Sequence, residues 1–306
     1  MRKTKSAVPR VCVERINAVL DELRDYWPLT LRQVFYRLVS AGDIKNDPKG
    51  NEYKRLSRML TKARYDELVP WEAMEDRSRL ALRRPSWWDK TDFIQESMDE
   101  FLSEYHRDPL QSQDRVLEVW LEKDALSRIV QRAAAPFGVL VVIARGFIST
   151  SFMDAVRRRI EARAEFGWPT RILYFGDLDP SGWEMPLDIE RRLIDRMNLA
   201  GKVDIERCAL TLGQVREYQL PHKPDALKVR DPRAREYVRR FGPLAVELDA
   251  LSPPTLERLV RESIERNIDM EAYRAEVEAG KAEEPFIHNL RSRVAAVVGD
   301  VMGGAL

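Results

Sequence analysis

The chain has 306 residues, of which 44% are hydrophobic and 33% charged, and its formal net charge is +1. That length fits two domains, or one large domain with an appendage. No apolar run approaches the length of a membrane span, no secretory signal is visible, and the two cysteines form no zinc-binding spacing. We therefore expect a reduced cytoplasmic protein. The three scattered histidines argue against a His-based metal site and against a Ser-His-Asp triad.

Charge is unevenly distributed along the chain. Residues 1–90 hold 20 Lys and Arg against 13 Asp and Glu, whereas residues 245–306 hold 7 against 12. A basic front end is typical of a protein that touches nucleic acid there, so we expect association with the nucleoid. An imbalance of this size also occurs in proteins that bind no nucleic acid.

The N-terminal part, residues 1–90, has the pattern of three helices followed by a short strand. Apolar residues recur at helical spacing in three segments, residues 10–25, 31–42 and 51–68. Thr30 is a suitable N-cap for the second of them. The segment VPWEAM, residues 69–74, is predicted as a strand. This order indicates a winged-helix (CAP-like) domain, whose third helix enters the major groove of DNA.

The third predicted helix carries a basic stripe. Its members are the candidate DNA-binding residues Lys54, Arg55, Arg58 and Lys62. A solvated helix face is the alternative interpretation of such a stripe. Residues 91–113 then continue with helical periodicity and a polar stretch of Pro, Gln and Ser, which predicts a helical connector.

From residue 114 onward, apolar strand patterns alternate with helical ones. Strands are predicted at 116–121, 139–143, 172–175 and in VDIERCAL, with helices starting near Asp124, Thr150 and after Gly182. Alternation of this kind implies parallel strands with crossover helices, as in a Rossmann-like domain. Residues 211–306 are predicted as a mostly helical extension.

Three acids follow two of these strands directly. Glu122 ends the first strand, and Asp177 and Asp179 follow the third. Carboxyl ends of parallel strands lie at one edge of a sheet, where open α/β folds place ligands. Closely spaced carboxylates repel one another unless a cation sits between them, and Mg²⁺, or Mn²⁺, prefers such oxygen ligands. The alternative is that Asp-x-Asp-Pro-x-Gly is only a polar turn.

A second acid pair, Glu247 and Asp249, precedes two prolines at a predicted helix start. These acids are either further members of the metal site or surface residues leading into the helix, and the pattern favours the surface. No phosphate-binding glycine loop is present, so the sequence does not support ATP use by this chain.

Several of these motifs resemble a known family. Glu122 in LEKDA, Gly146 in ARGFI and the run from Asp177 to Gly182 resemble the three motifs of a Toprim domain, closest to those of the topoisomerase VI A subunit and the related meiotic recombination initiators. The run from Arg32 to Tyr36 is similar to that family's tyrosine motif. The resemblance covers roughly residues 10–210 and is closest to the stand-alone Mini-A type.

The resemblance implies an α/β architecture with four parts. These are a winged-helix domain with the candidate nucleophile, a connector, a Toprim domain and a helical extension, at residues 1–90, 91–113, 114–210 and 211–306. The family tends to have Gly-aromatic-Pro where this chain has Gly146-Phe147-Ile148, so the shape of that loop is left open.

The resemblance also implies a reaction. Tyr36 would attack a DNA phosphate to form a 5′-phosphotyrosyl link, and Arg32, one helical turn away, would stabilise the phenolate or the phosphate. Asp177, Asp179 and Glu122 would hold Mg²⁺, or Glu122 would act as general acid for the leaving 3′ oxygen. A homodimer would cut both strands of double-stranded DNA, with the acids of one subunit serving the tyrosine of the other. A separate ATPase subunit is not excluded.

Two other functions remain open at this point. A Toprim nuclease would hydrolyse DNA with metal-activated water, as in a defence or mobile-element system, and Tyr36 would then be a packed helix aromatic. A non-catalytic protein would bind DNA through its winged helix alone.

Overall fold

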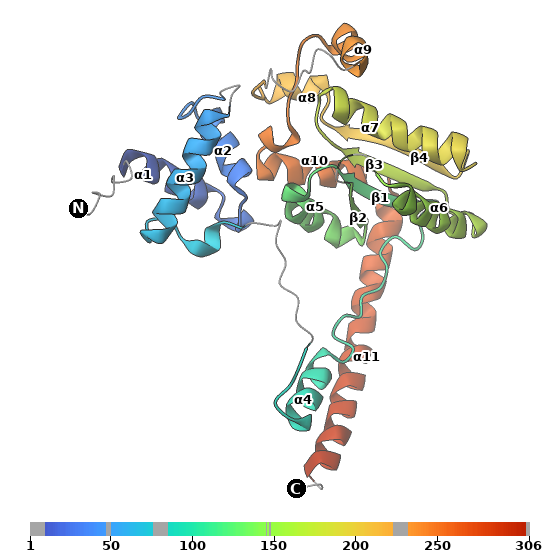
Figure 1. Cartoon of the computed structure of the whole chain (residues 1–306). Helices are drawn as coiled ribbons and strands as arrows, with labels where there is room; N and C mark the ends of the chain where they lie inside the picture. Colours follow the sequence, from blue (N-terminus) through green and yellow to red (C-terminus); the bar gives the residue numbers. More distant parts are fainter. Residues whose placement is uncertain are drawn as a thin grey trace. The chain divides into compact units, whose positions relative to one another are not determined.

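The computed structural model describes residues 10–46, 50–75, 85–144, 146, 148–222 and 232–303. The protein is α/β, with a helical N-terminal region, a four-stranded parallel sheet with helices, and a long C-terminal helix (Figure 1). It forms two compact units. The first combines Met1–Ser78 with Arg115–Asn267, and the second combines Arg79–Asp114 with Ile268–Leu306.

The sheet contains four strands, β1 (Val116–Leu121), β2 (Leu140–Ile143), β3 (Thr170–Phe175) and β4 (Val203–Ala209). All neighbouring pairs are parallel, and the order is β2-β1-β3-β4. This confirms the predicted strands and their parallel pairing, although β3 begins two residues earlier than expected. The apolar runs that predicted β1 and β3 are buried in the centre of the sheet, which is typical of strands covered on both faces.

Helices cover both faces of this sheet (Figure 1). On one face, α6 (Thr150–Glu165) and α7 (Pro180–Arg191) pack over a core that includes Trp120, Ile172 and Tyr174. On the other face lie α5 (Ser127–Ala134) and α10 (Pro253–Glu265), which pack against each other. This buried frame fixes where the loops at the carboxyl ends of the strands emerge.

The N-terminal region contains the three predicted helices, α1 (Arg10–Glu22), α2 (Leu31–Ser40) and α3 (Asn51–Tyr65). Thr30 caps α2 as expected. Its hydroxyl accepts the backbone N–H of Gln33, whose side chain accepts the Thr30 N–H at 2.7 Å. This capping box sets the start of α2 and therefore the orientation of Arg32 and Tyr36.

The prediction of a strand at residues 69–74 is wrong. The segment forms a 3₁₀ turn, η2 (Trp71–Ala73), and makes only an isolated bridge between Met74 and Leu29. Pro70 explains the difference, because it removes a ladder donor and its carbonyl accepts the Ala73 N–H at 3.4 Å to close the turn. The basic segment in which a wing would follow, residues 76–84, lies outside the described residues.

After β4 the chain forms α8 (Leu212–Glu217), α9 (Pro232–Phe241) and the 3₁₀ turn η7 (Leu248–Ala250) before α10. Just before η7, Val246 makes an antiparallel bridge with Leu178, the residue between the two predicted metal-ligating aspartates. The chain therefore returns to the edge of the sheet from which those aspartates emerge.

The second unit consists mainly of α4 (Lys90–Glu100), as predicted for the connector, and α11 (Met270–Gly303). Arg107 joins its two segments through ion pairs with Glu276 at 2.6 Å and Glu283 at 2.7 Å. Within the described residues, no helix combines the length and the apolar character that crossing a bilayer requires.

Candidate active site

The predicted acids lie at the switch point of the sheet. The chain leaves β1 toward β2 on one side and later returns through β3 on the other, so a ligand crevice is expected between the carboxyl ends of β1 and β3. Glu122 follows β1 and Asp177 follows β3. Their loops are joined because the Glu122 carboxylate accepts the backbone N–H of Asp177 at 2.9 Å. The structure thus brings these two predicted residues together.

Two glycines allow this close approach. A Cβ on Gly176 would lie 2.6 Å from the Glu122 carboxylate and 2.6 Å from the Tyr174 ring. A Cβ on Gly182 would lie 2.4 Å from the backbone carbonyl of Asp177. Real Cβ atoms do not approach other atoms so closely. At Gly182 the obstructing atoms are backbone, so the position requires glycine, whereas at Gly176 the side chains of Glu122 and Tyr174 would have to shift. The Gly in Asp-x-Asp-Pro-x-Gly therefore has a packing role beyond a turn.

Asp179, the third predicted acid, starts helix α7. Its carboxylate accepts the N–H of Gly182 at 2.7 Å, which is the usual contact of an N-cap residue. The side chain is half-buried, and its charge acts on Glu122. Asp179 thus belongs to the same acidic edge while it also fixes the start of the helix.

Lys123, which the sequence did not single out, lies at the centre of the acid cluster. Its ammonium is 2.9 Å from the Asp177 carboxylate, 2.6 Å from Asp249 and 3.5 Å from Glu247. The second Asp177 oxygen accepts the backbone N–H of Leu248 at 2.7 Å. Glu247 and Asp249 are buried. The prediction that they lie at the surface is wrong, because the Leu178–Val246 bridge draws their segment under the edge of the sheet.

The electrostatics of this edge reflect crowded negative charge. Burial and then repulsion from Asp177 raise the pKa of Glu122 to about 8. Burial raises the pKa of Asp177 to about 6, although Lys123 opposes the rise. Burial lowers the pKa of Lys123, but Asp177, Asp249 and Glu247 outweigh it and raise that pKa above its ordinary value. Such strongly perturbed groups in one cluster are typical of functional sites.

The predicted nucleophile belongs to the same network. The Tyr36 hydroxyl donates a hydrogen bond to the Glu247 carboxylate at 2.8 Å, and the Arg32 guanidinium lies 3.4 Å from the same oxygen. Tyr36 is only 3% exposed. Burial, followed by the negative charge of Glu247, raises the pKa of Tyr36 above its ordinary value.

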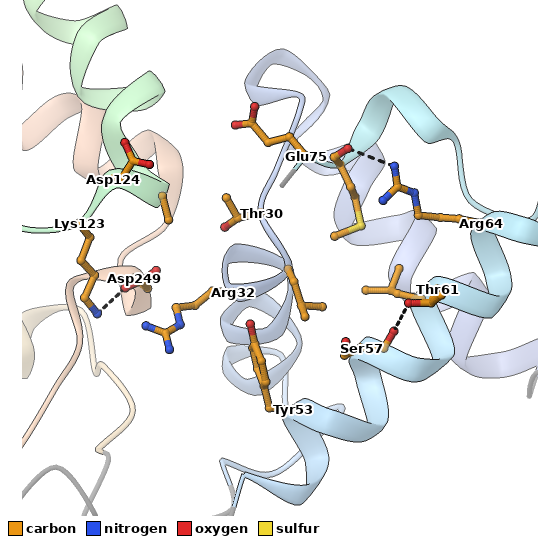
Figure 2. A pocket seen from close by; sticks show the side chains of 14 residues that line it. Thr30, Arg32, Tyr53, Ser57, Thr61, Arg64, Glu75, Lys123, Asp124 and Asp249 are labelled. Atoms are coloured by element: carbon orange, nitrogen blue, oxygen red, sulfur yellow. Dashed lines mark hydrogen bonds and ion pairs between the residues drawn. The ribbon is translucent and has the colours of Figure 1, made fainter. Parts of the chain in front are cut away.

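A cleft of about 710 Å³ opens beside this network. Figure 2 shows Arg32 and Tyr53 of the helical region facing Lys123 and Asp249 across it, with Arg64 further along the α3 wall. The predicted DNA-binding residues do not line this cleft. They lie on another face of α3, where the first three are exposed and the last is half-buried: Lys54, Arg55, Arg58 and Lys62.

The edge carries the oxygen donor type that a hard divalent cation takes. Glu122, Asp177 and Asp179 supply carboxylate oxygens, and two buried polar atoms, Tyr174 Oη and Asp249 Oδ1, have no hydrogen-bond partner in the described part of the chain. As they stand, however, no three His, Cys, Asp or Glu side chains among the described residues are arranged to hold a metal ion. In this structure the Lys123 ammonium supplies the positive charge instead.

The remaining motif of the resemblance is only partly visible. Gly146 has a φ of 62°, a left-handed conformation that glycine adopts without strain. The adjoining Phe147, where the family pattern and this chain begin to differ, lies outside the described residues. Among known proteins, no family model, curated sequence or solved structure matches the chain.

Proposed function

We propose that this chain cleaves DNA by Mg²⁺-dependent transesterification, as the topoisomerase VI A subunits that it resembles do. In this proposal Tyr36 attacks a backbone phosphate and forms a 5′-phosphotyrosyl link. One observation carries the proposal. A continuous set of hydrogen bonds and ion pairs runs from Tyr36 through Glu247 and Lys123 to Asp177, whose N–H binds Glu122. The candidate nucleophile and two of the candidate metal ligands, although far apart in the sequence, thus belong to one network, whose residues Arg32, Lys123 and Asp249 line the cleft.

The residues of this network and its neighbours have distinct roles in this proposal. Glu122, Asp177 and Asp179 would hold Mg²⁺, with Mn²⁺ as an alternative, and the bound ion would neutralise charge on the scissile phosphate. Arg32 and Lys123 line the cleft and present cations to phosphate oxygens. Glu122 serves either as a metal ligand or as the acid that protonates the leaving 3′ oxygen, since its raised pKa keeps it protonated at neutral pH without metal.

Binding of the duplex is assigned to the N-terminal region, which we regard as the winged-helix domain, and catalysis to the Toprim-like sheet. The exposed basic stripe on α3 would contact DNA phosphates outside the cleft. A homodimer would then make a double-strand break, one strand for each tyrosine, in the cytoplasm at the nucleoid. A separate ATPase subunit could accompany it.

A second candidate function is hydrolysis of DNA by the same acids without a covalent intermediate. The burial of Tyr36 favours it, because the residue is only 3% exposed and is not among those that line the cleft. In that case Tyr36 is structural and Asp177 remains essential.

Incubation with supercoiled DNA and Mg²⁺ or Mn²⁺, followed by denaturant with or without protease, separates the candidates. Protein-linked 5′ ends that disappear in Tyr36→Phe support transesterification. Tyr65→Phe is the matched control, since Tyr65 is 74% exposed on α3 and is not among the residues that line the cleft. Free ends that survive Tyr36→Phe but vanish in Asp177→Asn would establish hydrolysis instead. DNA that is bound but never cut would leave only a DNA-binding protein.

A further inference from the structure

Glu247 occupies a central position that the sequence did not assign to it. One of its oxygens, Oε2, accepts the Tyr36 hydroxyl at 2.8 Å. The same oxygen lies 3.4 Å from the Arg32 guanidinium and 3.5 Å from the Lys123 ammonium. A nucleophile, a carboxylate within hydrogen-bond reach of it, and further groups that orient that carboxylate make up the usual arrangement of an activated nucleophile.

The fold holds this carboxylate in place from both sides. Val246 pairs with Leu178, with both backbone hydrogen bonds at 2.9 Å, and the N–H of Leu248 binds Asp177 at 2.7 Å. Glu247 lies between these two anchored residues and is itself buried. Its position is therefore fixed by the same backbone segment that holds Asp177, so the carboxylate is preorganised toward Tyr36 rather than free to choose a partner.

Tyr36 needs such a partner to react. Burial and the nearby negative charge of Glu247 raise the pKa of the phenol, so a phenolate does not form at rest near neutral pH. The proton must therefore leave while the new bond forms, and the group that accepts it must already be in hydrogen-bond contact. Glu247 is the carboxylate in that position, and the positively charged side chains of Arg32 and Lys123 lie beside it.

We propose that Glu247 is the proton acceptor that activates Tyr36 for attack on the DNA phosphate, an inference that rests on the proposed transesterification. In this step the Tyr36 proton moves to Glu247 Oε2 while the Tyr36 oxygen bonds to phosphorus. The bond from phosphorus to the deoxyribose 3′ oxygen breaks, and that oxygen leaves with a proton from Glu122 or from water. Resealing reverses the transfer, and Glu247 returns the proton to the tyrosine.

The test measures the rate of covalent adduct formation by Glu247→Gln at saturating DNA and metal. General base catalysis contributes about 10²–10⁴-fold, so we expect a loss of that size with little change in DNA binding. The matched control is Glu257→Gln. Glu257 on α10 likewise lies close enough to a tyrosine, Tyr26, to raise its pKa and pairs with Arg132, but it is not part of the site network. The Glu257→Gln substitution should leave the rate of adduct formation unchanged.

A second measurement separates proton transfer from a structural role. Replacing Tyr36 with a fluorinated tyrosine, whose phenol is a stronger acid, should restore much of the rate in Glu247→Gln, because less help is then needed to remove the proton. The conservative variant Glu247→Asp, which keeps a carboxylate, should lose less activity than Glu247→Gln. It also tests the proposal if Glu247→Gln fails to fold.

The outcomes of these tests are distinct. If wild type forms the adduct and Glu247→Gln forms it as fast, or if fluorination restores nothing, Glu247 is not the proton acceptor although the proposed function stands. If wild type forms no Tyr36-dependent adduct at all, the proposed function itself is wrong.

Discussion

Replacement of Lys123 by methionine should destabilise the first unit strongly and in a pH-dependent way. Methionine keeps much of the length of the side chain but removes the ammonium, which is the shared cation of Asp177, Asp249 and Glu247. The Lys123 side chain is only 15% exposed, and the side chains of its two closest partners are less exposed still. Water therefore cannot easily hydrate the carboxylates that lose their cation.

The expected magnitude follows from the cost of an uncompensated buried charge. Removing one partner of a buried ion pair costs about 3–5 kcal/mol, and here one substitution leaves two carboxylates without their cation. We therefore expect Lys123→Met to lower the free energy of unfolding by at least that amount near neutral pH. Proton uptake by Asp177, whose pKa is already raised to about 6, limits the loss.

The sign of the pH dependence can be worked out from Asp177. Lys123 lowers the pKa of Asp177, so the substitution raises that pKa further. A carboxyl group with a raised pKa in the folded state binds its proton more readily when folded, so stability increases as pH falls through that pKa. The deficit of Lys123→Met should therefore be largest above about pH 7 and should shrink toward about pH 5.5.

Urea unfolding at these two pH values measures the effect. The double variant Lys123→Met, Asp249→Asn provides the control, because neutralising one of the stranded acids should recover part of the loss. A deficit below about 1 kcal/mol at neutral pH, the range of exposed ion pairs, would refute the view that Lys123 is a buried structural cation.

Three further predictions follow from other contacts. Gly182→Ala should lower the free energy of unfolding by about 1–3 kcal/mol, since its Cβ would meet the Asp177 carbonyl, and a thermal midpoint like that of wild type would contradict this. An equimolar mixture of Tyr36→Phe and Asp177→Asn chains should not nick supercoiled DNA if each tyrosine works with the acids of its own chain, as their contacts here suggest, whereas nicking by the mixture would show sharing between subunits. Glu118→Gln should lower the free energy of unfolding by about 3–5 kcal/mol at neutral pH, because a buried carboxylate paired with Arg159 is lost. Although burial raises the pKa of Glu118, its contacts with Arg159 outweigh burial and keep that pKa below its ordinary value. The deficit should therefore fall as pH drops through that range, which urea unfolding at acid pH will check.

The sequence was informative where structure is local. Short apolar runs between turn residues predicted β1 and β3 and therefore the acids that follow them, and Thr30 predicted the start of α2. The strand predicted at residues 69–74 shows the limit of the approach, because one proline was enough to favour a 3₁₀ turn over a ladder.

The missing part of the site depends on contacts between distant segments. Tyr36 and Glu247 are 211 positions apart, and nothing in their local patterns links them. One signal was available in VELDA, where Val246, Leu248 and Ala250 alternate with acids as in a half-buried strand. That alternation, which the structure confirms as burial of all three apolar residues, could have indicated that the acids lie near a core rather than at the surface.

The return of the chain to the edge of the sheet affects how its parts can be separated. A shortened protein that stops after β4 would retain Tyr36, Glu122, Asp177 and Asp179, so by its motifs alone it would look complete. It would nevertheless lack the backbone donor of Asp177 and the acceptor of the tyrosine hydroxyl, both of which come from residues 247 and 248. The candidate site is thus assembled from segments that are far apart in the polypeptide, and loss of the segment around residues 247 and 248 would leave it incomplete.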